Sequence, residues 1–217
     1  MSYLTLSKSK KIIFSREAIS IALSDAELAT VLSQFGFAPD TLNAGRVLQE
    51  TVETFDADKQ RAFGIRVELT NRVETLQADI LKAFRTDRRI AKFVFKDLPG
   101  SLEQLGVSVK IKGNRDDLHQ QMKHFYQELL NNEDLQASMA VYNITAETLS
   151  ERLSRVAELT QAMEELQVQR ATALLMTQRR LNAQAELDEW MSQFLGVAKQ
   201  AFRGDKKQLE KLGLRVK

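Results

Sequence analysis

The sequence contains two copies of one pattern, and the copies lie 107 residues apart. When the chain is shifted by that distance, Leu28–Lys110 aligns with Leu135–Lys217 without a gap, and 17 of the 83 aligned positions are identical. The clearest match pairs Leu102–Gly106 with Leu209–Gly213. An internal repeat constrains the architecture more than composition does, because each copy is expected to form the same structural unit. The sequence therefore predicts two related halves.

Composition is typical of a folded helical protein. The chain has 217 residues, enough to bury a core as one larger domain or two coupled ones, and 43% of them are hydrophobic. Two prolines and nine glycines leave few helix breakers. The absence of cysteine excludes disulfides and thiol catalysis. The formal net charge of +2 is too small to indicate a polyanion partner by itself.

Hydropathy shows no secretion signal and no membrane span. The first residues are basic, but the apolar run that follows is only Ile12–Phe14, whereas a signal peptide needs about 7–15 apolar residues there. No later stretch approaches the roughly 20 apolar residues of a membrane span. We expect a cytoplasmic protein that does not enter a membrane.

The expected fold is all-α, an elongated bundle built from two tandem helical hairpins. We expect a basic N-terminal segment at residues 1–15, a first repeat at 16–110 and a second repeat at 111–217, with the repeats packed together as one bundle. The opening helices are expected at Arg16–Phe35 and Asp116–Tyr142. In the first of them, Ser24-Asp25-Ala26-Glu27 has the spacing of a capping box, so this helix is expected to bend or restart there.

Local signals predict where the next helix of each repeat begins. Gly36 and Asn143 hold equivalent positions after the opening helices, and both residue types tolerate the left-handed conformation of a helix end. Pro39 fits the first position of a helix, and Thr145 fits an N-cap. Both repeats are therefore expected to share the same turn.

Each turn is followed by an unusually long predicted helix, over residues 39–96 and 146–203. An apolar heptad pattern continues for more than six heptads in the first of these, and no proline interrupts either one after its start. A continuous helix over 39–96 would be about 85 Å long. Such lengths are rare, so a break near 55–64 and 163–171 is the alternative. We favour the continuous helices.

Residue patterns that support catalysis are sparse. His119 and His124 are the two histidines, and their spacing places them about 140° apart on a helix, a poor arrangement for metal ligands. We expect both at the surface or its boundary. There is no glycine-rich phosphate loop, Gly-x-Ser-x-Gly or His-Glu-x-x-His motif. We predict no enzymatic activity, cofactor or metal site. The first function hypothesis is a non-catalytic scaffold or protein-interaction module with an unknown protein partner.

The main functional signal is a basic cluster near the end of the first long helix. Its six members fall within 15 residues, in which Asp87 is the one acidic residue: Lys82, Arg85, Arg88, Arg89, Lys92 and Lys96. All of them except Lys82 recur at helical spacing and are expected to form one charged face. Two further basic clusters lie near the chain ends, at Lys8, Lys10, Lys11 and Arg16 and at Arg203, Lys206, Lys207, Lys211, Arg215 and Lys217. Basic faces attract phosphates by counterion release, but basic residues also favour helix C-termini. Nucleic acid or another polyanion is the alternative function hypothesis.

Aromatic residues recur at helical spacing near the ends of both long helices. The second repeat has Trp190, Phe194 and Phe202, and the first has Phe84, Phe93 and Phe95. We expect them to pack in the core, and an apolar patch facing a partner is the alternative. A second chain could also cover the long apolar seam, so a homo-oligomer is possible.

The chain resembles a group of uncharacterised bacterial helical proteins, some with duplicated halves. The resemblance is carried by Phe125-Tyr126 with Leu129-Leu130, by Tyr142–Glu147 and by Leu209–Leu214. It covers nearly the whole chain, and its motifs are helix ends, turns and packing residues. It implies a helical fold, and it implies no activity, cofactor or site residue.

Overall fold

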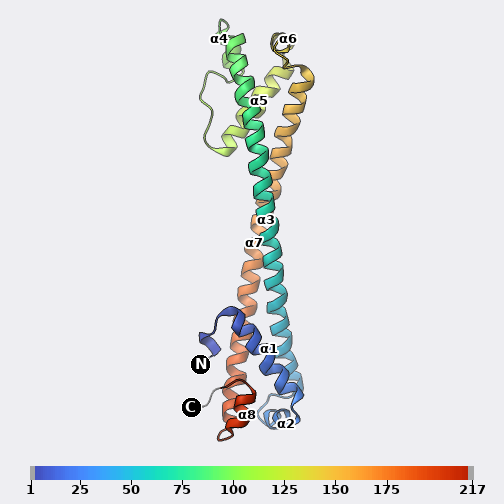
Figure 1. Cartoon of the computed structure of the whole chain (residues 1–217), viewed down its shortest axis with the longest axis vertical. Helices are drawn as coiled ribbons and strands as arrows, with labels where there is room; N and C mark the ends of the chain where they lie inside the picture. The colour runs from blue at the N-terminus through green and yellow to red at the C-terminus, as the bar shows by residue number, and fades with distance from the viewer. Residues whose placement is uncertain (1–2, 215–217) are drawn as a thin grey trace. The chain divides into compact units, whose positions relative to one another are not determined.

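The protein is all-α, as predicted. The computed structural model describes residues 3–214, which form helices and turns without a β-strand. None of the described helices is long and apolar enough to cross a membrane. Figure 1 shows a short 3-10 helix and the α-helices, whose bounds are η1 Tyr3–Thr5, α1 Lys8–Ser24, α2 Ala26–Gln34, α3 Pro39–Val94, α4 Pro99–Gln104, α5 Arg115–Asn131, α6 Glu133–Ala140, α7 Ala146–Ala201 and α8 Lys206–Lys211.

The two long helices are continuous. Helices α3 and α7 have 56 residues each. The alternative of a break near residues 55–64 and 163–171 is therefore wrong, and both helices end two residues earlier than predicted. No proline follows the first residue of α3 and none occurs in α7, so every interior residue of both helices keeps its backbone hydrogen-bond donor.

The opening helices differ from the prediction. Helix α1 begins at Lys8 instead of Arg16, so part of the segment 1–15 is helical. The chain restarts at Asp25, whose carboxylate accepts hydrogen bonds from two backbone N–H groups of α2 at 3.1 and 3.2 Å. Asn132 caps α6 in the same way and separates it from α5, a break that the sequence pattern did not predict. Both breaks follow from a side-chain oxygen that competes with the continuing helix.

The turns into the long helices follow the prediction. Gly36 has a φ of 88° and Asn143 a φ of 60°, so both are left-handed. Pro39 is the first residue of α3. The Thr145 hydroxyl accepts a hydrogen bond from the N–H of Thr148 at 3.3 Å, as expected of an N-cap. These local interactions determine where each long helix begins.

The chain forms two compact units. Unit 1 comprises residues 1–64 and 171–217, and unit 2 comprises residues 65–170. Each unit therefore contains one part of α3 and one part of α7, and each combines residues from both predicted repeats. In Figure 1, α1, α2 and α8 belong to unit 1, whereas α4, α5 and α6 belong to unit 2.

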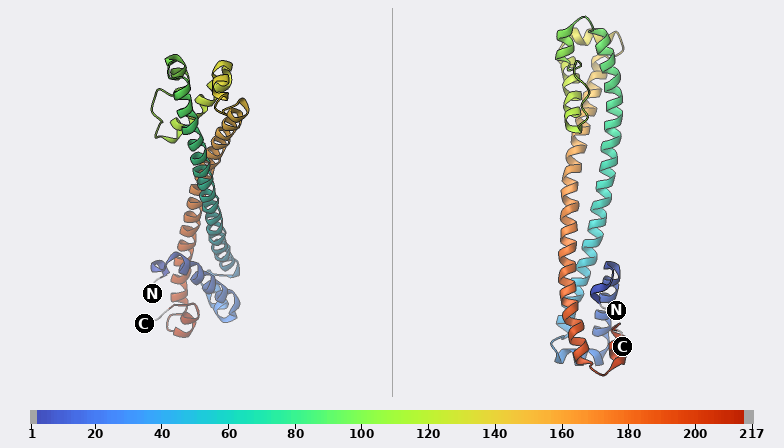
Figure 2. Two further views of the ribbon diagram at one scale, coloured as in Figure 1. Left: turned by 45° about the horizontal axis from the view of Figure 1, so that its top comes forward. Right: turned by 90° about the vertical axis from the view of Figure 1, so that its left-hand side faces the viewer.

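In unit 1, an aromatic group joins α7 to the start of α3. The rings of Phe37, Trp190 and Phe194 lie with centroids 5.3–5.6 Å apart. Gly45 makes room for them, because a Cβ at this position would lie 2.3 Å from the Trp190 ring. The core packing predicted for Phe194 and Phe202 is confirmed, since both are buried in the core of this unit. Figure 2 shows α1 beside the two long helices in this unit.

In unit 2, α3, α5 and α7 meet around a buried polar contact. Phe84, Phe125 and Tyr126 form an aromatic group with centroids 5.2–6.2 Å apart. The Tyr126 hydroxyl donates a hydrogen bond to Asp87 at 3.0 Å, and the Arg152 Nε lies 3.6 Å from the same carboxylate oxygen. Burial raises the pKa of Asp87, although Tyr126 and Arg152 act in the opposite direction. The contact fixes how the three helices are aligned.

Candidate polyanion-binding face

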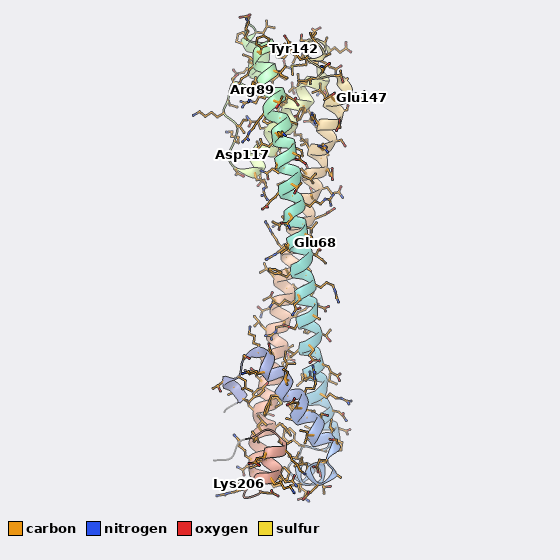
Figure 3. The ribbon with its side chains drawn as sticks, viewed as in Figure 1. Glu68, Arg89, Asp117, Tyr142, Glu147 and Lys206 are labelled. Atoms are coloured by element: carbon orange, nitrogen blue, oxygen red, sulfur yellow. The ribbon has the colours of Figure 1, made fainter. Side chains whose placement is uncertain are left out.

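Four members of the predicted basic cluster share an exposed face of α3 within unit 2. Residues three, four or seven positions apart lie on the same side of an α-helix. Lys82, Arg85, Arg89 and Lys92 follow this spacing and are all exposed. Lys96 is also exposed but lies in the turn after the helix. We call Lys82, Arg85, Arg89 and Lys92 the α3 basic face; Figure 3 labels Arg89 within it.

Arg88 does not belong to this face, which corrects the prediction. It is only 7% exposed. Its guanidinium donates hydrogen bonds to the carbonyl oxygens of Val107, at 3.0 Å, and of Val109. Burial lowers the pKa of Arg88, yet an arginine remains protonated in proteins. Its positive charge therefore lies beside the α3 basic face without contributing an exposed side chain.

The contact with Arg88 holds the segment 107–112 against α3 and brings two further cations into unit 2. Lys110 and Lys112 are exposed on this segment. From the other side, Gln121 of α5 donates to the carbonyl of Lys110 at 3.3 Å and accepts from the N–H of Lys112 at 3.2 Å. The sequence shows both lysines, but their position depends on tertiary contacts that leave no local signal.

Three members of the other two basic clusters form ion pairs, whereas Lys8, Lys10, Arg203, Lys206 and Lys207 form none with the described residues. Lys11 and Arg16 each pair with a carboxylate of unit 1, and Lys211 lies 2.7 Å from the carboxylate that caps α2. Arg215 and Lys217 lie outside the described residues. In the described part of the chain, no carboxylate is within ion-pair distance of any member of the α3 basic face. These four side chains are therefore exposed to solvent without an ion pair to the described residues.

Two exposed aromatic side chains border the α3 basic face. Phe84 and Phe95 are buried as predicted, but Phe93 is 62% exposed. Core packing is therefore wrong for Phe93, and the alternative of an apolar patch that faces a partner stays a prediction. Phe93 follows Arg89 by four residues and so lies on the same side of the helix. Tyr142, from the turn before α7, is 42% exposed and meets Phe93 edge to face, with centroids 6.1 Å apart.

The two histidines make structural hydrogen bonds. His119 is buried, contrary to the prediction, and its Nε2 lies 2.7 Å from the Thr160 hydroxyl and 3.3 Å from the carbonyl of Val156. His124 is exposed, and its Nε2 lies 2.8 Å from the carbonyl of Gln104. Within residues 3–214, no group of three or more His, Asp or Glu side chains is arranged to hold a metal ion.

A shallow groove runs beside an opening helix in each unit. The groove between α5 and α7 has a volume of about 410 Å³, and the groove between α1 and α3 has about 420 Å³. Lys123 and Glu164 line the first, and Arg16 and Glu53, which pair with each other, line the second. Because each groove carries both signs of charge, neither favours a ligand of one charge as the α3 basic face does.

Comparison with known proteins does not place the chain in a family. No protein-family model matches it, no curated protein sequence matches it, and no solved structure matches its fold. The α3 basic face and its aromatic border are therefore the features that best indicate a ligand.

Proposed function

We propose that this protein is a non-catalytic binding protein that takes up a polyanion through the α3 basic face. The observation that carries the proposal is a row of four exposed cations for which the described residues provide no paired carboxylate. A polyanion bound there would release its condensed counterions, which is the main driving force of such association. Lys110, Lys112 and the buried charge of Arg88 add to the positive potential at this part of unit 2.

The helix dipole does not account for this face. A dipole favours cations only within the last turn of a helix. Helix α3 ends at Val94, and Lys82 and Arg85 lie more than two turns before that end. These two residues therefore gain little from the dipole, and solvent or a ligand must satisfy their charges.

Fluorescence anisotropy with labelled heparin and labelled inorganic polyphosphate tests the proposal. We expect the logarithm of the affinity to fall linearly with the logarithm of the salt concentration. A triple variant, Arg85→Glu, Arg89→Glu and Lys92→Glu, should weaken binding by at least about tenfold and reduce the salt slope by about 2. No binding by the wild-type protein at low salt would reject the proposal.

A matched control separates this face from net charge. Lys10, Lys206 and Lys207 are exposed lysines of unit 1. Changing these three to Glu alters the formal charge by the same amount as the triple variant. We expect the control to retain most of the affinity, and an equal loss in both variants would show that net charge, not the α3 basic face, drives binding.

We also propose that the two repeats arose by internal duplication. The bounds of three pairs of helices support this. When 107 is added to the first and last residue numbers of α1, α3 and α4, the results are the bounds of α5, α7 and α8. The same shift converts residues 1–64 into 108–171, so it exchanges the first part of unit 1 with the second part of unit 2. The left-handed residues Gly106 and Gly213 also correspond, with φ of 64° and 74°.

The duplicated copy does not repeat the α3 basic face. At the corresponding positions of unit 1, Lys82 is replaced by Glu189, Arg85 by Ser192 and Arg89 by Gly196. This difference assigns the proposed binding to unit 2 alone.

A second candidate function, a protein-interaction module, is favoured by exposed leucines on α7 within unit 1. Leu174 is 73% exposed and Leu181 is 43% exposed. Their separation of seven residues places them on one helix face, as in a coiled-coil seam. If a second copy covers this face, sedimentation should show a dimer that dissociates when both leucines are changed to Glu. A wild-type monomer would show that a second copy does not cover this face.

A further inference from the structure

We infer that the polyanion is a single-stranded nucleic acid, with Phe93 and Tyr142 stacking on its bases. This inference rests on the proposed polyanion binding and adds the class of ligand. It starts from the position of the two rings at the edge of the α3 basic face. Phe93 directly follows Lys92 and lies one turn beyond Arg89. A strand whose phosphates contact the basic side chains would therefore bring its bases to these rings.

The geometry of the two rings suits stacking on separate bases. They meet at an interplanar angle of 84°, so they are not stacked on each other. An edge-to-face pair leaves at least one face of each ring uncovered by the other ring. Both rings are also exposed to solvent. They therefore provide flat apolar surfaces next to cations, the combination with which proteins hold single strands regardless of base sequence.

The rings distinguish a single strand from a duplex. In a duplex, the base faces are stacked on one another, and a flat aromatic ring outside the helix cannot reach them. Cations alone would bind either form through phosphates. Only an unpaired strand can use the cations and both rings together, so the preference for single strands is the property that depends on Phe93 and Tyr142.

Unit 1 provides an internal comparison. Under the 107-residue shift, Tyr142 corresponds to Phe35, which is also exposed. Phe93 corresponds to Gln200, and of the α3 basic face only Lys92 is kept, as Lys199, whereas Lys82, Arg85 and Arg89 are replaced by uncharged or acidic residues. Unit 1 thus keeps one exposed ring without the second ring and without the row of cations. Phe35 is the matched control for Tyr142.

The test measures fluorescence anisotropy with three probes: a labelled single-stranded DNA or RNA oligonucleotide of mixed sequence, the corresponding duplex, and labelled heparin, which has no bases. We expect the wild-type protein to bind the single strand more tightly than the duplex at equal salt. Phe93→Ala and Tyr142→Ala should each weaken single-strand binding by about tenfold. Heparin binding should stay within about twofold, because it uses charge alone.

Further variants make the result specific. Phe35→Ala should leave single-strand binding unchanged, and Phe93→Trp should retain it, because tryptophan also offers a flat ring. Thermal unfolding followed by circular dichroism checks that the variants are folded. Alanine variants that bind the single strand as tightly as the wild type would overturn the inference, as would tighter binding to the duplex. If heparin still binds in that case, the proposed polyanion binding stands; if heparin also fails, the proposed function itself is rejected.

Discussion

Trp190 lies against the backbone of α3 at Gly45, a contact that depends on the missing side chain. Under the proposed duplication, Gly45 corresponds to Arg152 and Phe194 corresponds to Asp87. Arg152 and Asp87 form an ion pair in unit 2, whereas Trp190 and Phe194 stack in unit 1 with centroids 5.3 Å apart. Phe194 and Asp87 thus hold equivalent positions with different partners, since Trp190 corresponds to Ala83 and Arg152 to Gly45.

We predict that Gly45→Ala destabilises the protein. In an ordinary helix this change would stabilise by up to about 1 kcal/mol. Here the new Cβ would lie 2.3 Å from a rigid ring, and overpacking of this kind costs about 1–3 kcal/mol. Urea unfolding should therefore show a lower free energy of unfolding. Gly196→Ala is the control, because a Cβ there meets nothing within 4 Å; if both variants gain stability alike, Trp190 does not occupy this contact.

The stability contribution of Asp87 should depend on pH. Burial raises its pKa in the folded protein, whereas the unfolded chain keeps the ordinary value of about 3.9. The folded protein then holds the proton more tightly, so the contribution of Asp87 to the free energy of unfolding falls as the pH rises from about 4 through the raised pKa. Asp87→Asn removes this titration. The difference in unfolding free energy, wild type minus variant, should decline over that range in urea titrations at several pH values; a constant difference would contradict the prediction.

The bounds of a helix were predictable where the residues at its ends carry a local signal. The long helices follow the prediction within two residues, since Pro39, Gly36 and Asn143 determine their starts through backbone geometry. The break at Asn132 was not predicted, although Asn132 followed by the acidic residues Glu133 and Asp134 is a pattern typical of a helix start. Applying the 107-residue shift to the bend or restart predicted at Ser24–Glu27 would have indicated a break at residues 131–134.

We predict that an aspartate can replace the asparagine that caps α6, because an aspartate caps α2 in the same way. Asn132 accepts hydrogen bonds from the N–H groups of Asp134 and Leu135, both at 3.1 Å. Asn132→Ala should lower the free energy of unfolding by about 1 kcal/mol. Asn132→Asp should be tolerated, because Asp25 makes the same cap at the start of α2. Chemical denaturation of both variants tests this: equal losses would show that a carboxylate cannot replace the amide, and no loss in Asn132→Ala would show that the acceptor is not needed.

The candidate site was predictable only in part. Helical spacing correctly grouped Arg85, Arg89 and Lys92, because these residues share one side of the helix whatever packs on the other side. Spacing could not show that Arg88, at the border of that side, turns to bind two backbone carbonyls. The orientation of Arg88 depends on where the segment 107–112 lies in the folded protein. The same segment also positions the exposed Lys110 and Lys112.

At the scale of the whole molecule, the units and the repeats divide the chain differently. Unit 2 is one continuous stretch, residues 65–170, whereas unit 1 joins residues 1–64 with residues 171–217. A single repeat therefore contains part of each unit and the whole of neither. The core of unit 2, in contrast, is composed of residues from within 65–170.

We therefore predict that the fragment 65–170 folds alone and that single repeats do not. Circular dichroism should show cooperative thermal unfolding for this fragment, because it contains its complete core. The fragments 1–110 and 111–217 should each lack such a transition and regain it when they are mixed, since each unit needs helices from both. The fragment 65–170 also carries the α3 basic face, so it should bind labelled heparin about as tightly as the full chain. A folded, monomeric fragment 1–110 would contradict the division into units, whereas a folded fragment 65–170 without heparin binding would contradict the assignment of the polyanion site to unit 2.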